Sequence, residues 1–176
     1  MFLETVNIRL RPLEPEDLDI LYLWENDVNI WNVSNTVVPY SRYALKLYIE
    51  NSYKDIFETG QLRLMIENKT TGSAVGTVDL FDFDPMHERI ALGVLIYAES
   101  NRRQGFATEA LNLIVDYCFN ILRLHQVYCN VDESNTKSIK MLTNIGFDIV
   151  GIKKQWMKTS NGWQNEILLQ KINPDC

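Results

Sequence analysis

A short run of arginine and glycine, Arg102-Arg-Gln-Gly-Phe-Ala107, has the residue types that best fit binding chemistry in this sequence. It follows an apolar run that ends at Tyr97 and opens the clearest helical pattern in the chain, 106–122. The first amides of a helix lack partners within the helix and carry partial positive charge, which suits a phosphate. Gly105 has no Cβ, so a ligand can approach the backbone closely. An ordinary glycine turn with solvated arginines is the alternative, and the run alone leaves both open.

A second set of candidates is acidic and lies around the end of the third predicted strand: Asp79, Asp82, Asp84 and Glu88. Carboxylates can act as a general base or hold a cationic amine. The period of two in a strand places Asp79 and Asp82 on opposite faces unless the strand bends, so we expect at most one to face a cleft. A solvated acidic turn is the alternative, and the neighbouring Pro85 favours it for Asp84.

The elements that must position these residues mix helices and strands without strict alternation. The patterns predict strands over 7–12, 62–67, 74–81, 89–97 and 127–131, and two more around the Asn161-Gly162 turn. They predict helices over 14–24, 106–122 and 135–144, and one that Ser41 caps and that runs to about Phe57. With no repeat or linker between them, these elements indicate a mixed α/β (α+β) fold in a single domain over residues 1–176.

Composition excludes several classes of protein. The chain has 176 residues, of which 46% are hydrophobic and 23% charged, so it can bury a sizeable core and is not disordered. The formal net charge of -6 argues against a nucleic-acid binder and favours cationic small molecules or basic protein segments as partners. Residues 1–11 do not form a signal peptide, and no stretch is apolar enough to span a membrane.

The cysteines and histidines give no sign of a disulfide framework or a metal site. Cys118 and Cys129 fall at apolar positions of a predicted helix and strand, and the third cysteine, Cys176, ends the chain. His87 and His125 are isolated from one another and have no ligand spacing. We therefore expect reduced thiols, no metal and a cytoplasmic protein.

The motif Arg102-x-x-Gly105-x-Ala107, between a strand and a helix, resembles the acyl-coenzyme A signature Q/R-x-x-G-x-G/A of the GNAT N-acetyltransferase superfamily. Asn135-Thr-Lys-Ser138, followed by Asn144-Ile-Gly-Phe147, is similar to the second half of that signature. The order and spacing of the elements match across nearly the whole chain. Around 76–82 the sequence resembles the branch that holds spermidine N-acetyltransferases and ribosomal-protein N-terminal acetyltransferases.

The resemblance implies a GNAT fold: a twisted, mostly antiparallel sheet of six to seven strands, flanked by about four helices, with a splayed strand pair that holds acyl-CoA. It implies acetyl-CoA as co-substrate and direct transfer of the acetyl group to a primary amine, such as that of a polyamine. For Asn135 a helix N-cap is a second role, and both can hold together. The cofactor-binding residues that it implies are Leu95, Ile96, Tyr97, Arg102, Arg103, Gln104, Gly105, Phe106, Ala107, Thr108, Asn135 and Ser138.

Two positions depart from the pattern of the family. Many relatives carry a Tyr that protonates the leaving thiolate where this chain has Leu142, and often a Glu where it has Leu92. Leucine can neither donate nor accept a proton. The catalytic candidates that remain are Asp82, Asp79 and Tyr97, with a water as a further possible acid.

The acceptor candidates are Glu25, Asp27, Trp31 and Asp82, and an exposed polar loop is the alternative for the first three. Three functions stay open: acetylation of a small cationic amine, acetylation of a protein N-terminus such as that of a ribosomal protein, and CoA binding by a regulatory module without catalysis. A homodimer is common in this branch of the family. Tyr40, Tyr43 and Trp156 are interpreted as core or rim aromatics without a role.

Overall fold

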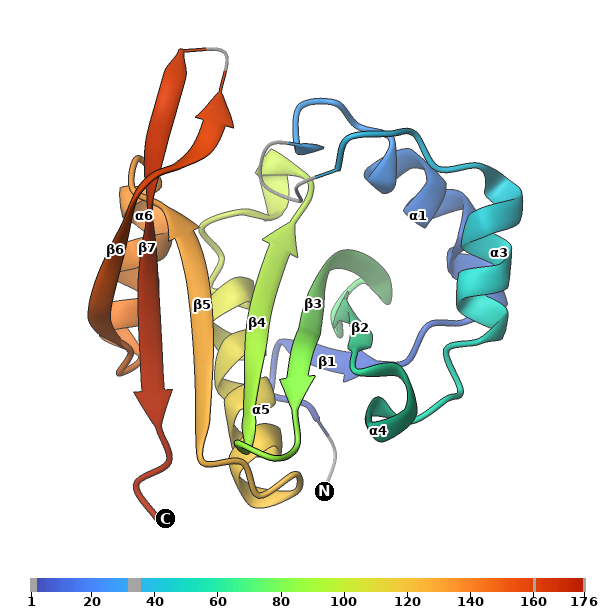
Figure 1. Cartoon of the computed structure of the whole chain (residues 1–176). Helices are drawn as coiled ribbons and strands as arrows, with labels where there is room; N and C mark the ends of the chain where they lie inside the picture. Colours follow the sequence, from blue (N-terminus) through green and yellow to red (C-terminus); the bar gives the residue numbers. More distant parts are fainter. Residues whose placement is uncertain (1–2, 32–35, 160, 176) are drawn as a thin grey trace.

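One seven-stranded sheet organises the computed structural model, which describes residues 3–31, 36–159 and 161–175. The strand order is β1-β2-β3-β4-β5-β7-β6, and every neighbouring pair is antiparallel except β4 and β5 (Figure 1). The strands are β1 (Ile8–Arg11), β2 (Leu62–Asn68), β3 (Ser73–Asp84), β4 (Arg89–Ile96), β5 (Gln126–Asp132), β6 (Asp148–Thr159) and β7 (Gly162–Ile172). This confirms the expected mixed α/β fold with a mostly antiparallel sheet.

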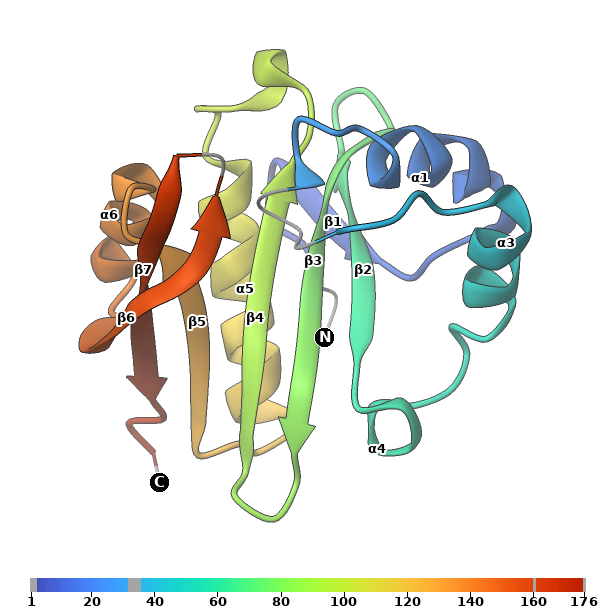
Figure 2. The ribbon, with the colours of Figure 1, turned by 45° about the horizontal axis from the view of Figure 1, so that its top comes forward.

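Helices cover both faces of the sheet. Two of them, α5 and α6, pack on one face, whereas α1 and α3 lie on the other, next to β2, where they pack against Met65 (Figure 2). The α-helices in the described part of the chain are α1 (Leu18–Glu25), α3 (Arg42–Glu50), α4 (Ile56–Thr59), α5 (Phe106–Asn120) and α6 (Thr136–Asn144). Within those same ranges, each helix is too short or too polar to cross a lipid bilayer.

The helix predicted from Ser41 to about Phe57 is wrong in its length. Ser41 does cap it, since its hydroxyl accepts a hydrogen bond from the amide of Ala44 at 3.0 Å, but α3 ends at Glu50. The side chains of Asn51 and Ser52 donate to backbone carbonyls of the last turn, and residues of this kind compete with helical hydrogen bonding. Asp55 then caps the separate short helix α4.

The alternation of β4 divides its side chains between two layers. Ile90, Leu92 and Ile96 pack in the main core, which lies between the sheet and α5 and α6. Ala91 and Gly93 therefore face the opposite side, the side that α1 and α3 cover farther along the sheet. We call this side the acceptor face. The leucine at position 92 is thus a core residue, and the acceptor face of β4 presents no carboxylate.

Two local irregularities set the relation of β3 to its neighbours. The register between β2 and β3 shifts by one residue at Ile66 and Glu67. On the other edge of β3, Gly76 lies so close to β4 that a Cβ atom on it would stand 2.1 Å from the carbonyl oxygen of Leu95. Only glycine fits such an approach, so Gly76 holds the carboxyl-terminal end of β4 against β3.

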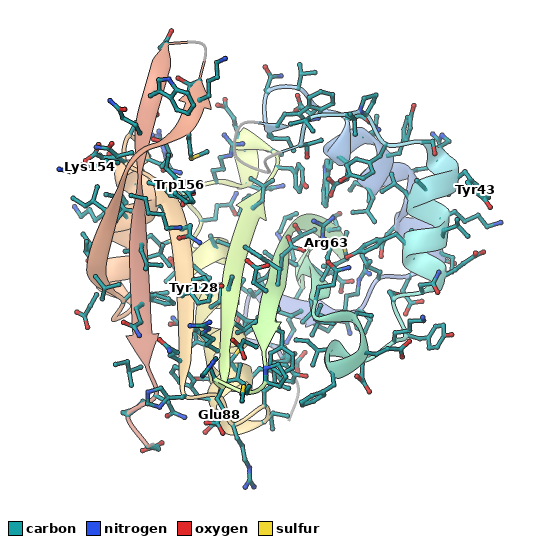
Figure 3. The ribbon with its side chains drawn as sticks, in the orientation of Figure 1. Tyr43, Arg63, Glu88, Tyr128, Lys154 and Trp156 are labelled. Carbon is teal, nitrogen blue, oxygen red and sulfur yellow. The ribbon has the colours of Figure 1, made fainter. Side chains whose placement is uncertain are left out.

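Three aromatic residues without an assigned role are exposed, so none of them belongs to the core. Tyr40 lies just before α3, and Tyr43 is exposed on α3 itself. Trp156 lies on the protruding β6–β7 hairpin, with the Lys153 ammonium 5.2 Å from the centre of its ring (Figure 3).

Candidate functional site

The two parallel strands at the centre of the sheet separate after a short paired stretch. β4 and β5 pair only where Arg89, Ile90 and Ala91 meet Gln126, Val127 and Tyr128. Beyond these pairs β4 continues beside β3, while β5 continues beside β7, so the two strands form an open fork (Figure 1). An extended ligand lying in the fork can satisfy the backbone groups that the strands leave unpaired on their inner edges.

Both halves of the acyl-CoA signature follow the carboxyl-terminal ends of these two strands. Residues 102–107 follow β4 and open α5, while Asn135 follows β5 and opens α6. Because the strands are parallel, their carboxyl ends lie at the same edge of the sheet. The fold therefore brings the two motifs to the two sides of the mouth of the fork.

The loop before α5 has the geometry of an anion site. Arg103 and Gly105 both adopt left-handed backbone conformations, with φ values of 64° and 85°. Gly105 is the N-cap of α5 and has no side chain, so the first-turn amides of Phe106, Ala107 and Thr108 have no capping side chain. A Cβ on Gly105 would approach only the Glu109 carboxylate, at 3.8 Å, so the space above this turn is open. Such a turn fits a pyrophosphate group.

Arg102 is used differently from Arg103. Its guanidinium donates to the carbonyl oxygens of Ile96 and Tyr97, at 3.0 Å in both cases. This side chain thus fixes the loop to the end of β4, where the pantetheine arm is expected. Arg102 would therefore position the loop that binds the phosphates and would not itself contact them. Arg103 is exposed on the same loop.

Asn135 is the N-cap of α6, as one of its two expected roles requires. Its side-chain oxygen accepts a hydrogen bond from the amide of Ser138 at 3.2 Å. The cap leaves the amide nitrogen of the Asn135 side chain as the group that can contact a ligand. Leu142, farther along the same helix, is buried in the main core, so α6 supplies no phenol at that position.

Two polar hollows flank the mouth of the fork among the described residues. One adjoins the loop before α5 and is lined by Asn7, Asn68, Thr70, Thr71, Gln104 and Phe106. The other adjoins the end of β5 and is lined by Glu133, Ser134, Trp163, Gln164 and Asn165.

On the acceptor face, three charged residues from three different elements form one ion-paired cluster. Arg63 of β2 donates from Nε to Oδ1 of Asp79 at 2.5 Å and from Nη2 to Oδ2 at 3.3 Å. Its Nη1 atom donates to the Glu25 carboxylate, at the end of α1. We call Glu25, Arg63 and Asp79 the Arg63 cluster. Figure 3 shows Arg63 between the central strands and the layer of α1 and α3.

The two carboxylates of this cluster keep Arg63 protonated. Burial lowers the pKa of Arg63, but the charges and hydrogen bonds of Asp79, together with the charge of Glu25, outweigh burial and raise it. The guanidinium is therefore always protonated. One guanidinium and two carboxylates give the Arg63 cluster a formal charge of one net negative.

Tyr97 adjoins the cluster at the end of β4. Its ring stacks on that of Trp24, with ring centres 4.0 Å apart and an interplanar angle of 8°. Burial, followed by the negative charge of Glu25, raises the pKa of Tyr97. The phenol is consequently a neutral proton donor throughout the physiological pH range.

The other acceptor candidates lie in less central positions. Asp82 is exposed, has φ 51° and sits in the irregular stretch of β3 that lies beside the paired, closed end of the fork. Asp27 accepts hydrogen bonds from the backbone and side chain of Asn29, so it closes a local turn. Trp31 is half-buried, and its ring nitrogen donates to the carbonyl of Glu25 at 2.9 Å.

Four residues of this site escaped the sequence analysis: Arg63, Trp24, Tyr48 and Thr77. Arg63 carried a usable signal, because a lone arginine inside an apolar strand requires a carboxylate partner. Tyr48 of α3 faces the Arg63 guanidinium at 5.8 Å from its ring centre, and the Thr77 hydroxyl lies 3.5 Å from Asp79. No three His, Cys, Asp or Glu side chains gather as metal ligands within the described ranges.

Known proteins share both the sequence pattern and the fold. A family model described as an acetyltransferase (GNAT) domain matches residues 7–148. Spermidine N(1)-acetyltransferase of Escherichia coli K12 is 30% identical to this chain over 82% of the chain and 75% of that protein.

Solved structures agree on the fold. A spermidine N-acetyltransferase from Vibrio cholerae, crystallised with CoA and spermine, has a TM-score of 0.85 at 23% identity, covering 96% of this chain and 97% of its own. A putative ribosomal-protein-serine acetyltransferase from Vibrio cholerae has a TM-score of 0.74 at 18% identity, covering 98% and 97%. With the fork and the anion-binding loop in place, the family match shows that the chain belongs to the GNAT family of N-acetyltransferases.

Proposed function

We propose that this N-acetyltransferase takes the acetyl group of acetyl-CoA and transfers it directly to a primary amine of a small polycation such as spermidine. The observation that carries the choice of acceptor is the net negative charge of the Arg63 cluster beside Tyr97, on the acceptor face at the end of β4. The E. coli relative is named for spermidine, and the V. cholerae structure contains spermine, which supports the same class of acceptor.

Acetyl-CoA would bind along the fork and supply the activated thioester. The backbone of Leu95, Ile96 and Tyr97 would pair with its pantetheine arm through those groups on the inner edge of β4 that neither β3 nor Arg102 already occupies. The amides of the loop from Arg103 to Thr108 would hold the pyrophosphate. Asn135 would donate from its side-chain nitrogen on the opposite side of the fork.

The chemical step needs a proton acceptor for the attacking amine and a proton donor for the leaving thiolate. Asp79 is the carboxylate of the cluster that stands on a sheet strand, and Asp82, beside the closed end of the fork, is the second candidate. Tyr97 keeps its phenolic proton and is the proposed donor. The amine attacks the thioester carbon and a carbon–nitrogen bond forms as the carbon–sulfur bond breaks. The proton lost by the amine passes to the carboxylate, the leaving thiolate takes the phenolic proton of Tyr97, and solvent returns a proton to the phenol.

Acetylation of a protein N-terminus is the second candidate, favoured by the structural similarity to the putative ribosomal-protein-serine acetyltransferase. An acceptor screen separates the two. Release of the CoA thiol would be measured with spermidine, spermine, simple monoamines and basic peptides with free N-termini. We expect release with the polyamines; release with peptides alone would establish the second candidate. Binding of acetyl-CoA without release by any acceptor would indicate a regulatory module.

Three further properties belong to the same proposal. Residues 1–176 would act as one catalytic domain. A homodimer would use β6, which ends the sheet and exposes Ile149, Val150 and Ile152. The free thiols of Cys118 and Cys129 are buried, which is compatible with a cytoplasmic enzyme. Light scattering of wild type and an Ile152→Lys variant tests the dimer, which the charge would dissociate.

A further inference from the structure

We propose that Arg63 is a positioning residue for the acceptor: it orients Asp79 and Glu25 beside the Tyr97 ring, so that their remaining negative charge receives the acceptor ammonium group. This assignment deepens the proposed function and rests on it. Arg63 itself would contact neither acetyl-CoA nor the reacting amine, because its donors are directed to the two carboxylates.

The contacts of Arg63 fix both carboxylates at once. The two-point contact with Asp79 holds the plane of that carboxylate, and the third donor holds Glu25. A planar guanidinium can make this set of bonds, whereas a lysine ammonium is a point charge and cannot make the same bidentate contact. Asp79 keeps an open side, since about a quarter of its side chain (26%) is exposed.

Without Arg63 the same carboxylates would face an unfavourable environment. Glu25 is the last residue of α1 and only 7% exposed, so its charge lies at the negative end of a helix dipole. Asp79 would add a second negative charge nearby. Arg63 offsets one of the two charges, and so keeps the buried Glu25 and the half-buried Asp79 compatible with the fold while leaving a single charge for a ligand.

The surroundings direct that charge toward a cation. The groups that face the cluster are uncharged: the Tyr48 ring of α3 lies against Arg63, the Thr77 hydroxyl of β3 lies 3.5 Å from Asp79, and Tyr97, which stacks on Trp24, is close enough to feel the charge of Glu25. Burial raises the pKa of both tyrosines, so neither adds a competing negative charge at neutral pH. Aromatic faces next to a carboxylate are a typical environment for an ammonium group. Because Tyr97 directly follows β4, this environment lies beside the fork.

Three variants of the full chain test the role of Arg63. Arg63→Lys keeps the positive charge and loses the bidentate set of hydrogen-bond donors. The double variant Arg63→Met with Glu25→Gln keeps the net charge of the cluster and serves if the lysine variant is unstable. Arg11→Lys is the matched control, since Arg11 also bridges two carboxylates, Asp17 and Glu67, but at β1 and away from the fork.

Steady-state kinetics with spermidine and acetyl-CoA provide the readout. We expect Arg63→Lys and the double variant to raise the KM for spermidine by about tenfold or more, with the KM for acetyl-CoA changed less than about twofold. The Arg11 control should leave both KM values unchanged. A folded Arg63 variant with wild-type KM for spermidine, or with equal losses for both substrates, would overturn the positioning role alone. A wild-type enzyme that acetylates no polyamine would overturn the proposed function and this role together.

Discussion

Arg63 and Asp79 stand directly opposite one another on β2 and β3, and this pairing depends on a single register shift in the hairpin. Next to the turn, Asn68 pairs with Ser73. If this register continued without a shift, Val78 would stand opposite Arg63, and Asp79 would face the main core instead of the acceptor face. The irregularity at Ile66 and Glu67 moves the pairing by one residue, so both charges reach the acceptor face.

The two candidate carboxylates of β3 should therefore differ in importance. We expect Asp79→Asn to lower kcat/KM for spermidine by about a hundredfold, because it removes a group of the cluster and a possible base. Asp82→Asn should weaken the use of cationic acceptors by only about threefold, since Asp82 is exposed and its effect is through space. Both variants should bind acetyl-CoA normally by calorimetry. If Asp82→Asn is the more damaged enzyme, the base is Asp82, beside the closed end of the fork.

Tyr97→Phe tests the proposed proton donor without disturbing the ring stack on Trp24. We expect kcat to fall about tenfold or more, with little change in the KM for acetyl-CoA. Because the pKa of Tyr97 is raised, the wild-type kcat should not decline through loss of this proton below about pH 10. A pH profile of Tyr97→Phe that matches wild type, with the same kcat, would assign the donor to water.

Gly105→Glu should abolish acetyl-CoA binding. The substitution places a negative side chain at the first amides of α5 and forces a non-glycine residue to φ 85°. Gly72→Ala is a matched control, because Gly72 has a similar φ of 68° in the β2–β3 turn. Strain at Gly72 should destabilise the fold by about 1–2 kcal/mol and leave the affinity for acetyl-CoA unchanged. Retained binding by folded Gly105→Glu would remove the pyrophosphate from this loop.

Gly76→Ala should weaken both folding and cofactor binding. The added methyl group would overlap the carbonyl of Leu95, so β3 and β4 must separate where β4 borders the fork. We expect a loss of roughly 1–3 kcal/mol in the free energy of unfolding, measured in urea. Gly93→Ala, whose Cβ would meet its nearest atom at 3.5 Å, should be tolerated. Equal stability of the two variants would contradict the close approach at Gly76.

The buried thiols predict a loss of stability in alkali. Burial raises the pKa of Cys118 and Cys129 from 9.0 to about 12. Between these values the thiols ionise in the unfolded chain and stay protonated in the fold, so rising pH favours unfolding by about 1.4 kcal/mol per unit and per thiol. Below pH 9 neither contributes. Urea unfolding at pH 8 and above pH 10 should show a smaller decrease for Cys118→Ala than for wild type.

The sequence predicted most elements of the fold because their patterns are local. The caps at Ser41 and Asn135 and the amphipathic pattern of α5 each depend on a few neighbouring residues. The end of α3 was missed, since Asn51 and Ser52 terminate it through side-chain bonds that helical periodicity does not reveal.

The cofactor loop could be predicted for the same reason, as it occupies one continuous motif. The Arg63 cluster could not be predicted, because it joins residues of α1, β2 and β3. It also depends on the register shift at Ile66 and Glu67, which decides the face of the sheet on which Asp79 lies. Period-two reasoning puts Asp79 and Asp82 on opposite faces only in a regular strand, and the register between β3 and β4 shifts between Phe81 and Asp84, so it gave no means to choose between the two carboxylates. The positive φ of Asp82 is equally a product of the β3–β4 connection and has no local signature.

The fork between β4 and β5 is a gap in the sheet that a bound cofactor would fill, with a consequence for local stability. β5 is held away from β4 by its seven-residue ladder with β7, so the carboxyl-terminal hairpin maintains the cleft although it lies outside the loop that carries the signature. An occupant of the fork completes the interrupted sheet as a substitute for a strand. Acetyl-CoA would then join the two halves of the molecule mechanically, and amide protons of residues 92–96 should exchange more slowly once it is bound.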